Sequence, residues 1–284
     1  VYLSLKKKAH PALSGAVLGL ACLTKGVYLI ALPAICAWNI IRFGLKAGAL
    51  NSIKFAAVAL LVILPWTAHN YKKYDAFVLI EPHIGLSMFI GHNPSATGGC
   101  DYYFVDRDYG KFYSDPCLSV TQKDKIAQEY ALKFILNNPA RELELFVLKL
   151  SKYWSFRTHF DMNNGPYPLR KFLYFSSLLT HMVLFPAFIL GAVFSADNKE
   201  GLISPLMIVV YTLVFTVLFS AFGRMRFTLV PFMIILAAKG AAMLPELAAR
   251  LRRGETSGMK GKLALAGALT AALYANFIYQ AWSK

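Results

Sequence analysis

The stretch Leu202–Gly223 reads LISPLMIVVYTLVFTVLFSAFG and contains no charged residue. A helix needs about 20 mostly apolar residues to cross the hydrocarbon core of a bilayer, and this stretch is long enough. A helix on the surface of a soluble protein has a polar face, which is missing here. The stretch therefore predicts a membrane-spanning helix.

Outward from this stretch, the rest of the chain has the composition of a membrane protein. Hydrophobic residues make up 57% of the 284 residues, charged residues only 16%, and the mean hydropathy is +0.47. Soluble domains carry about 25% charged residues, so a disordered chain, a coiled coil and a small disulfide scaffold are excluded, and the composition does not favour an ordinary soluble enzyme. Further apolar stretches predict spans at Ser52–Ala68, Phe172–Ala196, Phe227–Leu247 and Leu263–Trp282.

The segment Pro11–Arg42 is apolar except for Lys25, and basic residues flank it on both sides. Cytoplasmic loops of membrane proteins collect Lys and Arg. If both flanks are cytoplasmic, the chain turns back at Thr24-Lys25-Gly26 and forms two short helices, Pro11–Leu23 and Val27–Ile41. The alternative is one long kinked helix.

The net charge of +15 comes from 30 Lys and Arg against 15 Asp and Glu. Such a balance in a soluble chain would suggest nucleic acid, but the basic residues here lie between apolar stretches, so no nucleic-acid partner is predicted. The densest basic run, Arg250–Lys262, is placed in the cytoplasm. Counting back through the spans then places Ser195–Gly201 inside, and Gly223–Arg226 and His69–Arg170 outside.

The segment His69–Arg170 is too polar for lipid. Its first part, to about Cys117, indicates irregular structure with short strands such as Phe77–Ile80, and its second part indicates helices over Thr121–Leu136 and Ala140–Trp154. The second of these helices would lie against the membrane surface or pack on the spans. We therefore expect an all-α polytopic membrane protein of about seven spans, the first two short, with an α+β-like extracytoplasmic region. The expected parts are the membrane helices of residues 1–68, the loop domain of residues 69–170, and four more membrane helices in residues 171–284.

Cations near the apolar layer are the most informative single residues, because a charge at the bilayer centre costs about 2.5–3.5 kcal/mol. Lys25, Arg224 and Arg226 are predicted on the outer side, against the usual basic bias, where they could hold a lipid phosphate. The alternative is that they extend to outer headgroups. Lys239 lies within a span and could extend inward or pair with a buried acid.

Polar residues at two further places are candidates for a binding cavity. His69 and Asn70 follow Pro65-Trp66, where a span leaves the membrane, and Asn93 lies in the turn-forming stretch Gly91–Gly98. An interface anchor and a purely structural turn are the respective alternatives. Cys100 and Cys117 lie in the external region, where an oxidising compartment would permit a disulfide.

Four motifs, in order, resemble a known family. They are Gly19–Gly26 (GLACLTKG), Pro65–Tyr71 (PWTAHNY), Gly91–Gly98 (GHNPSATG) and Phe222–Pro231 (FGRMRFTLVP). They are similar to segments of bacterial GT-C glycosyltransferases of glycosyltransferase family 39, the dolichyl-phosphate-mannose mannosyltransferase and aminoarabinose transferase type. The chain departs from the family at His69, where Arg is usual, and at His92, where Asn is frequent.

The resemblance implies a partial GT-C fold and transfer of a sugar from a polyprenyl-phosphate donor at the outer face of the bacterial inner membrane. The donor phosphate would meet Lys25, Arg224 and Arg226, and the acceptor would meet His69, Asn70 and Asn93. The family's catalytic acid lies in a first external loop, and this chain has no acid before Asp75. We therefore expect the catalytic acid to lie upstream, and this segment alone to be inactive.

The remaining expectations concern partners and alternatives. Membrane lipids and a glycolipid, polysaccharide or protein acceptor are the expected partners. No metal-ligand motif is present; no cofactor is assigned, and a divalent metal ion stays an open alternative. The alternative functions are a non-catalytic membrane scaffold or assembly protein and a transporter, although a transporter would place its charges at the midplane.

Overall fold

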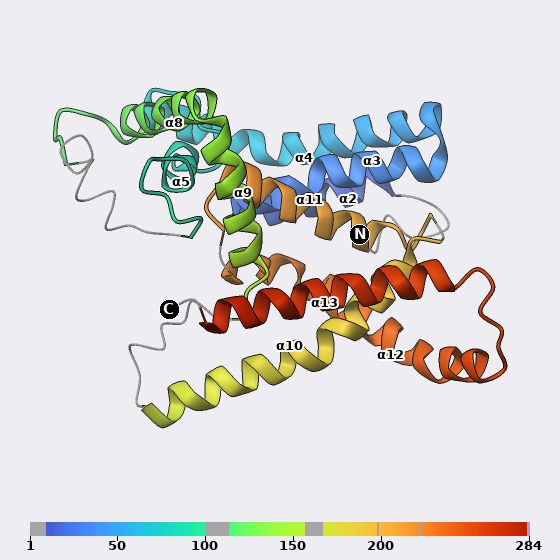
Figure 1. Ribbon diagram of the computed structural model, residues 1–284. Helices are drawn as coiled ribbons and strands as arrows, with labels where there is room; N and C mark the ends of the chain where they lie inside the picture. Colours follow the sequence, from blue (N-terminus) through green and yellow to red (C-terminus); the bar gives the residue numbers. More distant parts are fainter. Residues whose placement is uncertain (1–9, 100–113, 157–166, 198, 222, 283–284) are drawn as a thin grey trace. The chain divides into compact units, whose positions relative to one another are not determined.

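A computed structural model describes residues 10–99, 114–156, 167–197, 199–221 and 223–282, which form helices and no strand (Figure 1). The chain forms two compact units. The first comprises Val1–Leu150 and Val209–Ala221, and the second comprises Ser151–Ile208 and Phe222–Lys284. Each unit is described by itself below.

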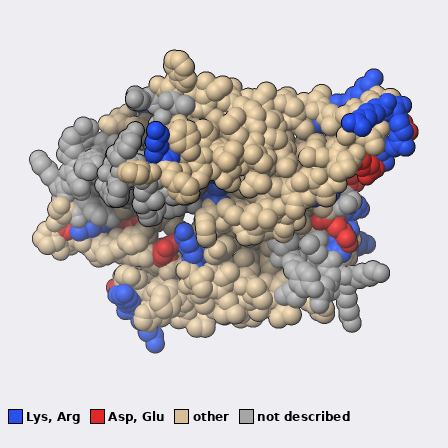
Figure 2. Space-filling model, turned by 90° about the horizontal axis from the view of Figure 1, so that it is seen from below, with Lys and Arg blue, Asp and Glu red and all other residues tan. Residues whose placement is uncertain are grey.

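Five helical segments are long and apolar enough to cross a membrane: Gly26–Phe43, Leu45–Tyr74, Tyr174–Ser195, Met225–Arg252 and Lys260–Gln280. Two shorter apolar helices, α2 (Pro11–Thr24) and α11 (Ile203–Leu218), accompany them. Large apolar side chains such as Leu61, Leu179 and Ile235 are exposed, as expected for surfaces that meet lipid. Much of the face shown in Figure 2 carries neither acidic nor basic side chains. Over the described residues, these features are typical of an all-helical membrane protein.

The decisive stretch Leu202–Gly223 forms a helix that is shorter than predicted. The α-helix α11 ends at Leu218, and the backbone N–H of Ala221 then donates to the carbonyl of Gly98 at 3.0 Å. The last apolar residues of the stretch therefore leave the helix to contact the Gly91–Gly98 segment. Their apolar composition did not reveal this partner.

The first helices form the predicted hairpin. Gly15 of α2 lies against Phe55 of α4 (Leu45–Tyr74), and Gly19 lies further along, against Val62, so α2 and α4 run parallel. In α3 (Ala31–Phe43) the order is reversed. Gly48 lies against Ile40, and the Ser52 hydroxyl donates to the Cys36 carbonyl at 3.2 Å.

Because α3 runs antiparallel to α4, it also runs antiparallel to α2. The chain therefore turns back between them. The short 3-10 helix η1 (Gly26–Ile30) follows Lys25 at this turn. The alternative of one long kinked helix is wrong.

The part of the first unit that follows α4 is built on α5 (Ile84–Gly91), α8 (Val120–Asn137) and α9 (Pro139–Tyr153). α8 begins with a reciprocal capping box between Ser119 and Gln122. The carboxylate of Asp124 accepts the N–H groups of Gly85 and Leu86, which caps α5. The predicted helices over Thr121–Leu136 and Ala140–Trp154 are thus confirmed.

The predicted strand Phe77–Ile80 is wrong. Side chains of α4 take up the carbonyl groups that a neighbouring strand would need. Thr67 donates to Leu79 O at 2.9 Å, and Asn70 donates to the carbonyls of Val78 and Ile80 at 3.1 and 3.0 Å. The segment is held against a helix instead, so the α+β-like expectation for this region is not supported.

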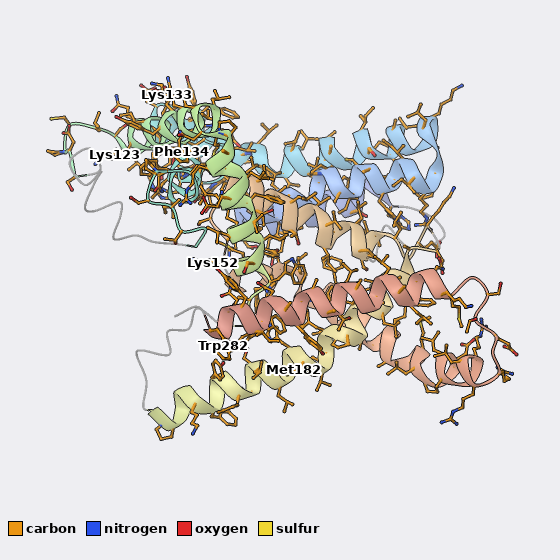
Figure 3. All side chains as sticks on the ribbon, viewed as in Figure 1. Lys123, Lys133, Phe134, Lys152, Met182 and Trp282 are labelled. Carbon is orange, nitrogen blue, oxygen red and sulfur yellow. The ribbon has the colours of Figure 1, made fainter. Side chains whose placement is uncertain are left out.

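The second unit contains α10 (Tyr167–Ser195), η2 (Gly223–Leu229), α12 (Val230–Arg252) and α13 (Lys260–Trp282). α10 and α12 run parallel, because Arg226 approaches His181 near one end and Gly240 approaches Gly191 further along. α13 runs antiparallel to α10. Lys262 pairs with Asp197 at one end, and the Tyr274 hydroxyl donates to the carbonyl of Met182 nearer the middle, where Figure 3 labels Met182 on α10.

This arrangement agrees with the predicted order of loops. The Lys262–Asp197 pair places the α10–α11 loop and the basic α12–α13 loop at one end of the second unit, and Arg226 lies toward the other end. Lys239 reaches along α10 toward the basic end and donates to the Ser195 hydroxyl at 2.9 Å. Lys239 therefore extends toward the end of the unit that carries the basic loop and pairs there with a hydroxyl, not with a buried acid.

Candidate functional site

Arg226 occupies a buried position at the start of a candidate span. Its side chain is only 7% exposed. One guanidinium nitrogen, Nη2, donates to the carbonyl of Ser155 at 2.5 Å and lies 3.4 Å from Nε2 of His181. The rings of Trp154 and Phe185 each lie 5.8 Å from the guanidinium carbon. A cation is thus fixed in orientation among a carbonyl, an imidazole and two aromatic faces.

The chain around Arg226 explains why the site forms there. Nδ1 of His181 lies 2.7 Å from the Ser177 carbonyl and must donate to it, so Nε2 is left to accept from Arg226. The Ser177 hydroxyl donates to the carbonyl of Phe156, which fixes the end of the segment that carries Ser155. His181 stacks on Phe185 with ring centroids 4.7 Å apart. Three separate elements therefore build the site.

The surroundings of the other two predicted phosphate ligands, Lys25 and Arg224, are less fully described than those of Arg226. Lys25 is exposed at the turn between α2 and η1 in the first unit, whereas Arg226 belongs to the second unit. Arg224 lies in η2, and its side chain lies outside the described residues. The structure therefore describes a fixed environment for Arg226, and the gathering of the three cations stays a prediction.

Of the three predicted cavity residues, His69 is exposed, whereas Asn70 and Asn93 are buried. His69 is exposed and stacks on Trp66 with centroids 5.2 Å apart. Asn70 is buried, and its amide is engaged by the carbonyls of Val78 and Ile80. Asn93 is also buried, and its amide N–H groups donate to the carbonyls of Phe89 and Ile90. Both asparagines thus have structural roles, although Oδ1 of Asn93 has no hydrogen-bond partner among the described residues.

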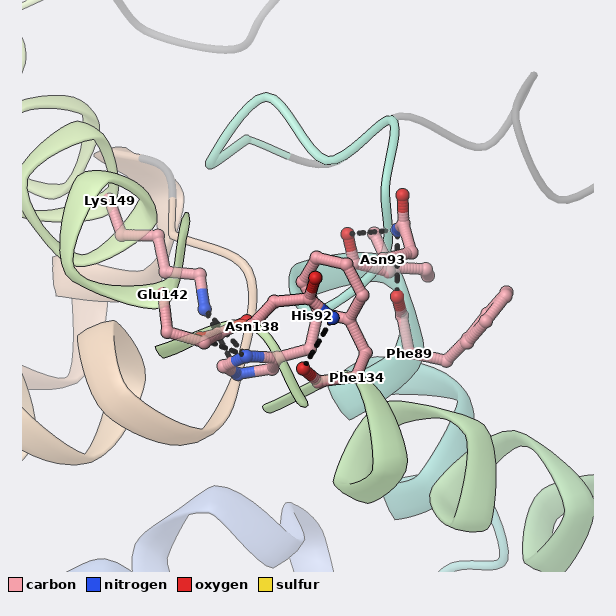
Figure 4. A network of polar contacts seen from close by, with 8 residues as sticks. Phe89, His92, Asn93, Phe134, Asn138, Glu142 and Lys149 are labelled. Atoms are coloured by element: carbon pink, nitrogen blue, oxygen red, sulfur yellow. Dashed lines mark hydrogen bonds and ion pairs between the residues drawn. The ribbon is translucent and has the colours of Figure 1, made fainter. Parts of the chain in front are cut away.

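Sequence reasoning missed a second buried polar cluster, which lies in the first unit (Figure 4). Nδ1 of His92 lies 2.7 Å from Oε2 of Glu142, and Nε2 of His92 lies 2.9 Å from Nζ of Lys149. His92 and Lys149 are each 1% exposed. We call these three residues the Glu142–His92–Lys149 cluster.

Charge and burial shift the pKa values in this cluster. Burial lowers the pKa of Lys149 from 10.5 to about 8, although the nearby Glu142 carboxylate opposes the shift. Burial and the Lys149 cation lower the pKa of His92, and Glu142 again acts in the opposite direction. Near neutral pH the cluster therefore holds a carboxylate, a neutral imidazole and an ammonium group.

The Gly91–Gly98 segment that carries His92 is packed by backbone approaches as well. A Cβ on Gly91 would lie 2.6 Å from the backbone of Phe219, and Gly98 has a φ of +80° beside Leu148 and Lys149. Arg141 donates to the carbonyl of Ala96 at 2.9 Å. The glycines of this motif are thus explained by close packing and turn geometry.

The cysteine and metal expectations have no described geometry to support them. Cys117 is exposed, but Cys100 lies outside the described residues, so their disulfide stays a prediction. Over residues 10–99, 114–156, 167–197, 199–221 and 223–282, no group of three or more His, Cys, Asp or Glu side chains is arranged to hold a metal ion.

Comparisons of the chain with protein-family models, with curated proteins and with solved structures give no match. The likeness to GT-C glycosyltransferases therefore rests on the four motifs alone.

Proposed function

We propose that the protein is the later part of an integral-membrane glycosyltransferase of the GT-C type. It would move a sugar from a polyprenyl-phosphate donor to an acceptor at the outer face of the bacterial inner membrane. The observation that carries this proposal is the buried guanidinium of Arg226. It lies at the start of a candidate span, at the end of the second unit away from the basic α12–α13 loop.

In the proposed reaction, the donor leaves as a lipid phosphate whose negative charge must be stabilised. A cation that is already oriented in a low-dielectric site stabilises such a charge without reorganising. The carbonyl of Ser155 and the two aromatic rings provide that orientation for Arg226. Lys25 and Arg224 would add charge from the hairpin turn and from η2.

The acceptor would be a glycolipid, a polysaccharide or a protein. Of the proposed cavity residues, His69 has an exposed ring and Asn93 has a buried oxygen that could accept a hydrogen bond from a hydroxyl group. The group that removes the proton from the acceptor hydroxyl would be the acid expected upstream of this chain. This division of roles makes donor binding the property that the chain itself should show.

Donor binding can be measured directly. The full chain in lipid nanodiscs is titrated with undecaprenyl phosphate, and Arg226→Gln is expected to raise the Kd at least tenfold. Where the chain is joined to the upstream segment, the same change should lower transfer by about 10²–10³-fold. Arg226→Lys, which keeps the charge but not the planar fork, should fall between Gln and the wild type.

The matched control is Arg252→Gln, because Arg252 is the last residue of α12, at the end opposite to Arg226. Circular dichroism and thermal unfolding of each variant separate loss of binding from loss of fold. If folded Arg226→Gln binds undecaprenyl phosphate as tightly as Arg252→Gln, the donor-site proposal is wrong. A chain that neither binds the lipid nor supports transfer would favour the scaffold, and movement of a solute without transfer would favour a transporter.

The proposed topology has its own test. After Cys100 and Cys117 are replaced by serine, Lys25→Cys should react with a membrane-impermeant maleimide on intact spheroplasts. Glu255→Cys, in the basic loop, should react only after the membrane is permeabilised, because basic loops stay in the cytoplasm. Labelling of both positions on the same side would overturn the topology.

A further inference from the structure

Beyond the proposed function, the Glu142–His92–Lys149 cluster connects α9 to the residue that follows α5 by two hydrogen bonds that depend on the charge of one imidazole. The Glu142 carboxylate accepts the proton of His92 Nδ1. Lys149 carries an ammonium group, which donates only, so the Nε2 lone pair of His92 must accept from it. The imidazole is therefore neutral, with its proton on Nδ1.

A proton added to Nε2 would remove the acceptor that Lys149 uses. It would also place a second positive charge 2.9 Å from the Lys149 ammonium group, in a site where both residues are almost fully buried. Charges so close in a poorly hydrated site repel one another strongly. Protonation therefore acts on the connection between α5 and α9.

We propose that the Glu142–His92–Lys149 cluster is a pH-sensitive latch, which holds α9 against the end of α5 near neutral pH and loosens it in acid. The inference concerns the first unit alone and is independent of any sugar transfer. The latch would respond to acidification on the side of the membrane where α9 lies.

The charged groups that act on His92 all belong to one helix, so one histidine controls the contact between that helix and the end of α5. Among the described residues, Glu142 and Lys149 are the charged groups that act on His92, and both belong to α9. Val217 of α11 contributes a backbone group. Arg141, which also joins α9 to the Gly91–Gly98 segment, pairs with Glu144.

The sign of the pH effect follows from the His92 pKa, which burial lowers below 6.5 in the latched state. The opened state, with an ordinary histidine, binds the proton more readily. Opening is therefore favoured as the pH falls below 6.5, and it continues to increase until the pH reaches the lowered pKa of the latched state. One proton can raise the opening constant up to about tenfold for each pH unit in this window.

Hydrogen–deuterium exchange of the full chain in nanodiscs tests the latch. After correction for the intrinsic effect of pH on exchange, the amides of 139–150 should lose protection as the pH falls from 7.5 to 5. His92→Gln should abolish this dependence, because a neutral amide can still donate to Glu142 and accept from Lys149 without titrating. His69→Gln is the matched control. It changes an exposed histidine of the same unit and should leave the wild-type dependence intact.

Lys149→Met provides a second readout if His92→Gln does not fold. Removing the cation should raise the His92 pKa, measured by NMR of labelled histidine, and the slope of exchange against pH should become shallower. The latch is overturned if α9 in the wild type exchanges equally at pH 7.5 and 5. It is also overturned if folded His92→Gln keeps the wild-type slope, or if Lys149→Met leaves the His92 pKa unchanged.

Discussion

The Gly240→Ala variant is expected to destabilise the second unit strongly. A Cβ on Gly240 would lie 1.9 Å from the carbonyl oxygen of Ala187, and a Cβ on Gly191 would lie 1.9 Å from that of Leu236. Both contacts are with helix backbone, which cannot move away by a change of rotamer as a side chain can. α10 and α12 would have to separate along their line of contact.

The expected cost is at the upper end of the range for overpacking, about 3 kcal/mol or more. In the membrane, close approach of helices through small residues is a main source of their association. Separation would therefore also remove dispersion contacts along the rest of the pair. Gly191→Ala should have an effect of similar size, because it faces the same contact from the other helix.

Gly267→Ala on α13 is the matched control, because nothing lies within 4 Å of the position of its Cβ. The same substitution there should be neutral or stabilise by about 0.5–1 kcal/mol, as Ala favours helix over Gly. Unfolding of the three variants in mixed micelles, followed by circular dichroism, gives the comparison. Equal stability of Gly240→Ala and Gly267→Ala would show that the two helices do not approach as described.

The membrane helices could be predicted from the sequence because their signal is local. The apolar run Ser52–Ala68 predicts a span without reference to any other residue, and the structure has a candidate span there. The hairpin turn at Lys25 follows from basic residues on both sides. The boundaries were less predictable. α11 ends early because Ala221 binds the carbonyl of Gly98, a partner more than a hundred residues away.

The same limit explains the wrong strand and the missed cluster. Phe77–Ile80 has residues typical of a strand, but Thr67 and Asn70 bind its carbonyls from a helix. His92 is separated from Glu142 and Lys149 by 50 and 57 positions, so no spacing in the sequence could join them. Two features offered a signal. Glu142 and Lys149 lie seven positions apart, on one side of a predicted helix, and His92 stands within a motif of turn residues.

Arg226 shows how a correct residue can have an unexpected environment. The sequence singled it out because a cation beside a span is costly. The contribution of Ser155, His181 and two aromatic rings could not be read from the sequence, since these residues come from distant segments. Any phosphate-binding role must therefore be played by a guanidinium that the protein has already oriented.

Glu142→Gln should be the most damaging change in the first unit outside the membrane helices. Glutamine keeps the shape of the side chain and an oxygen that can accept from Nδ1 of His92, so the change removes mainly the negative charge. Lys149 would then be a buried cation without its counter-charge. Breaking a buried ion pair costs about 3–5 kcal/mol, and we expect about 2 kcal/mol or more here, because the imidazole separates the two charges and Glu142 is partly exposed.

Glu144→Gln is a control on the same helix, two positions away. Glu144 pairs with Arg141 at 2.6 Å, but its side chain is 59% exposed. An exposed pair of this kind is worth about 0–1 kcal/mol, so Glu144→Gln should barely change the free energy of unfolding. Similar losses in the two variants would mean that burial of the cluster has no energetic consequence.

The pH dependence of the Glu142→Gln effect identifies Lys149 as its cause. The pKa of Lys149 is about 8 in the folded protein, because burial lowers it and the negative charge of Glu142 partly offsets this effect. Without Glu142, the buried lysine should lose its proton at lower pH than in the wild type. At pH 6 the variant must still bury a charged lysine, or lose its proton at a cost, whereas above pH 9 the lysine is neutral in both proteins. The difference in unfolding free energy should therefore shrink as the pH rises from 6 to 9.

In the Lys149→Met background, where no cation needs a partner, the destabilisation caused by Glu142→Gln should be smaller at all pH values. A loss that is constant with pH, or that persists in the Glu142→Gln/Lys149→Met double variant, would assign the effect to packing and not to charge.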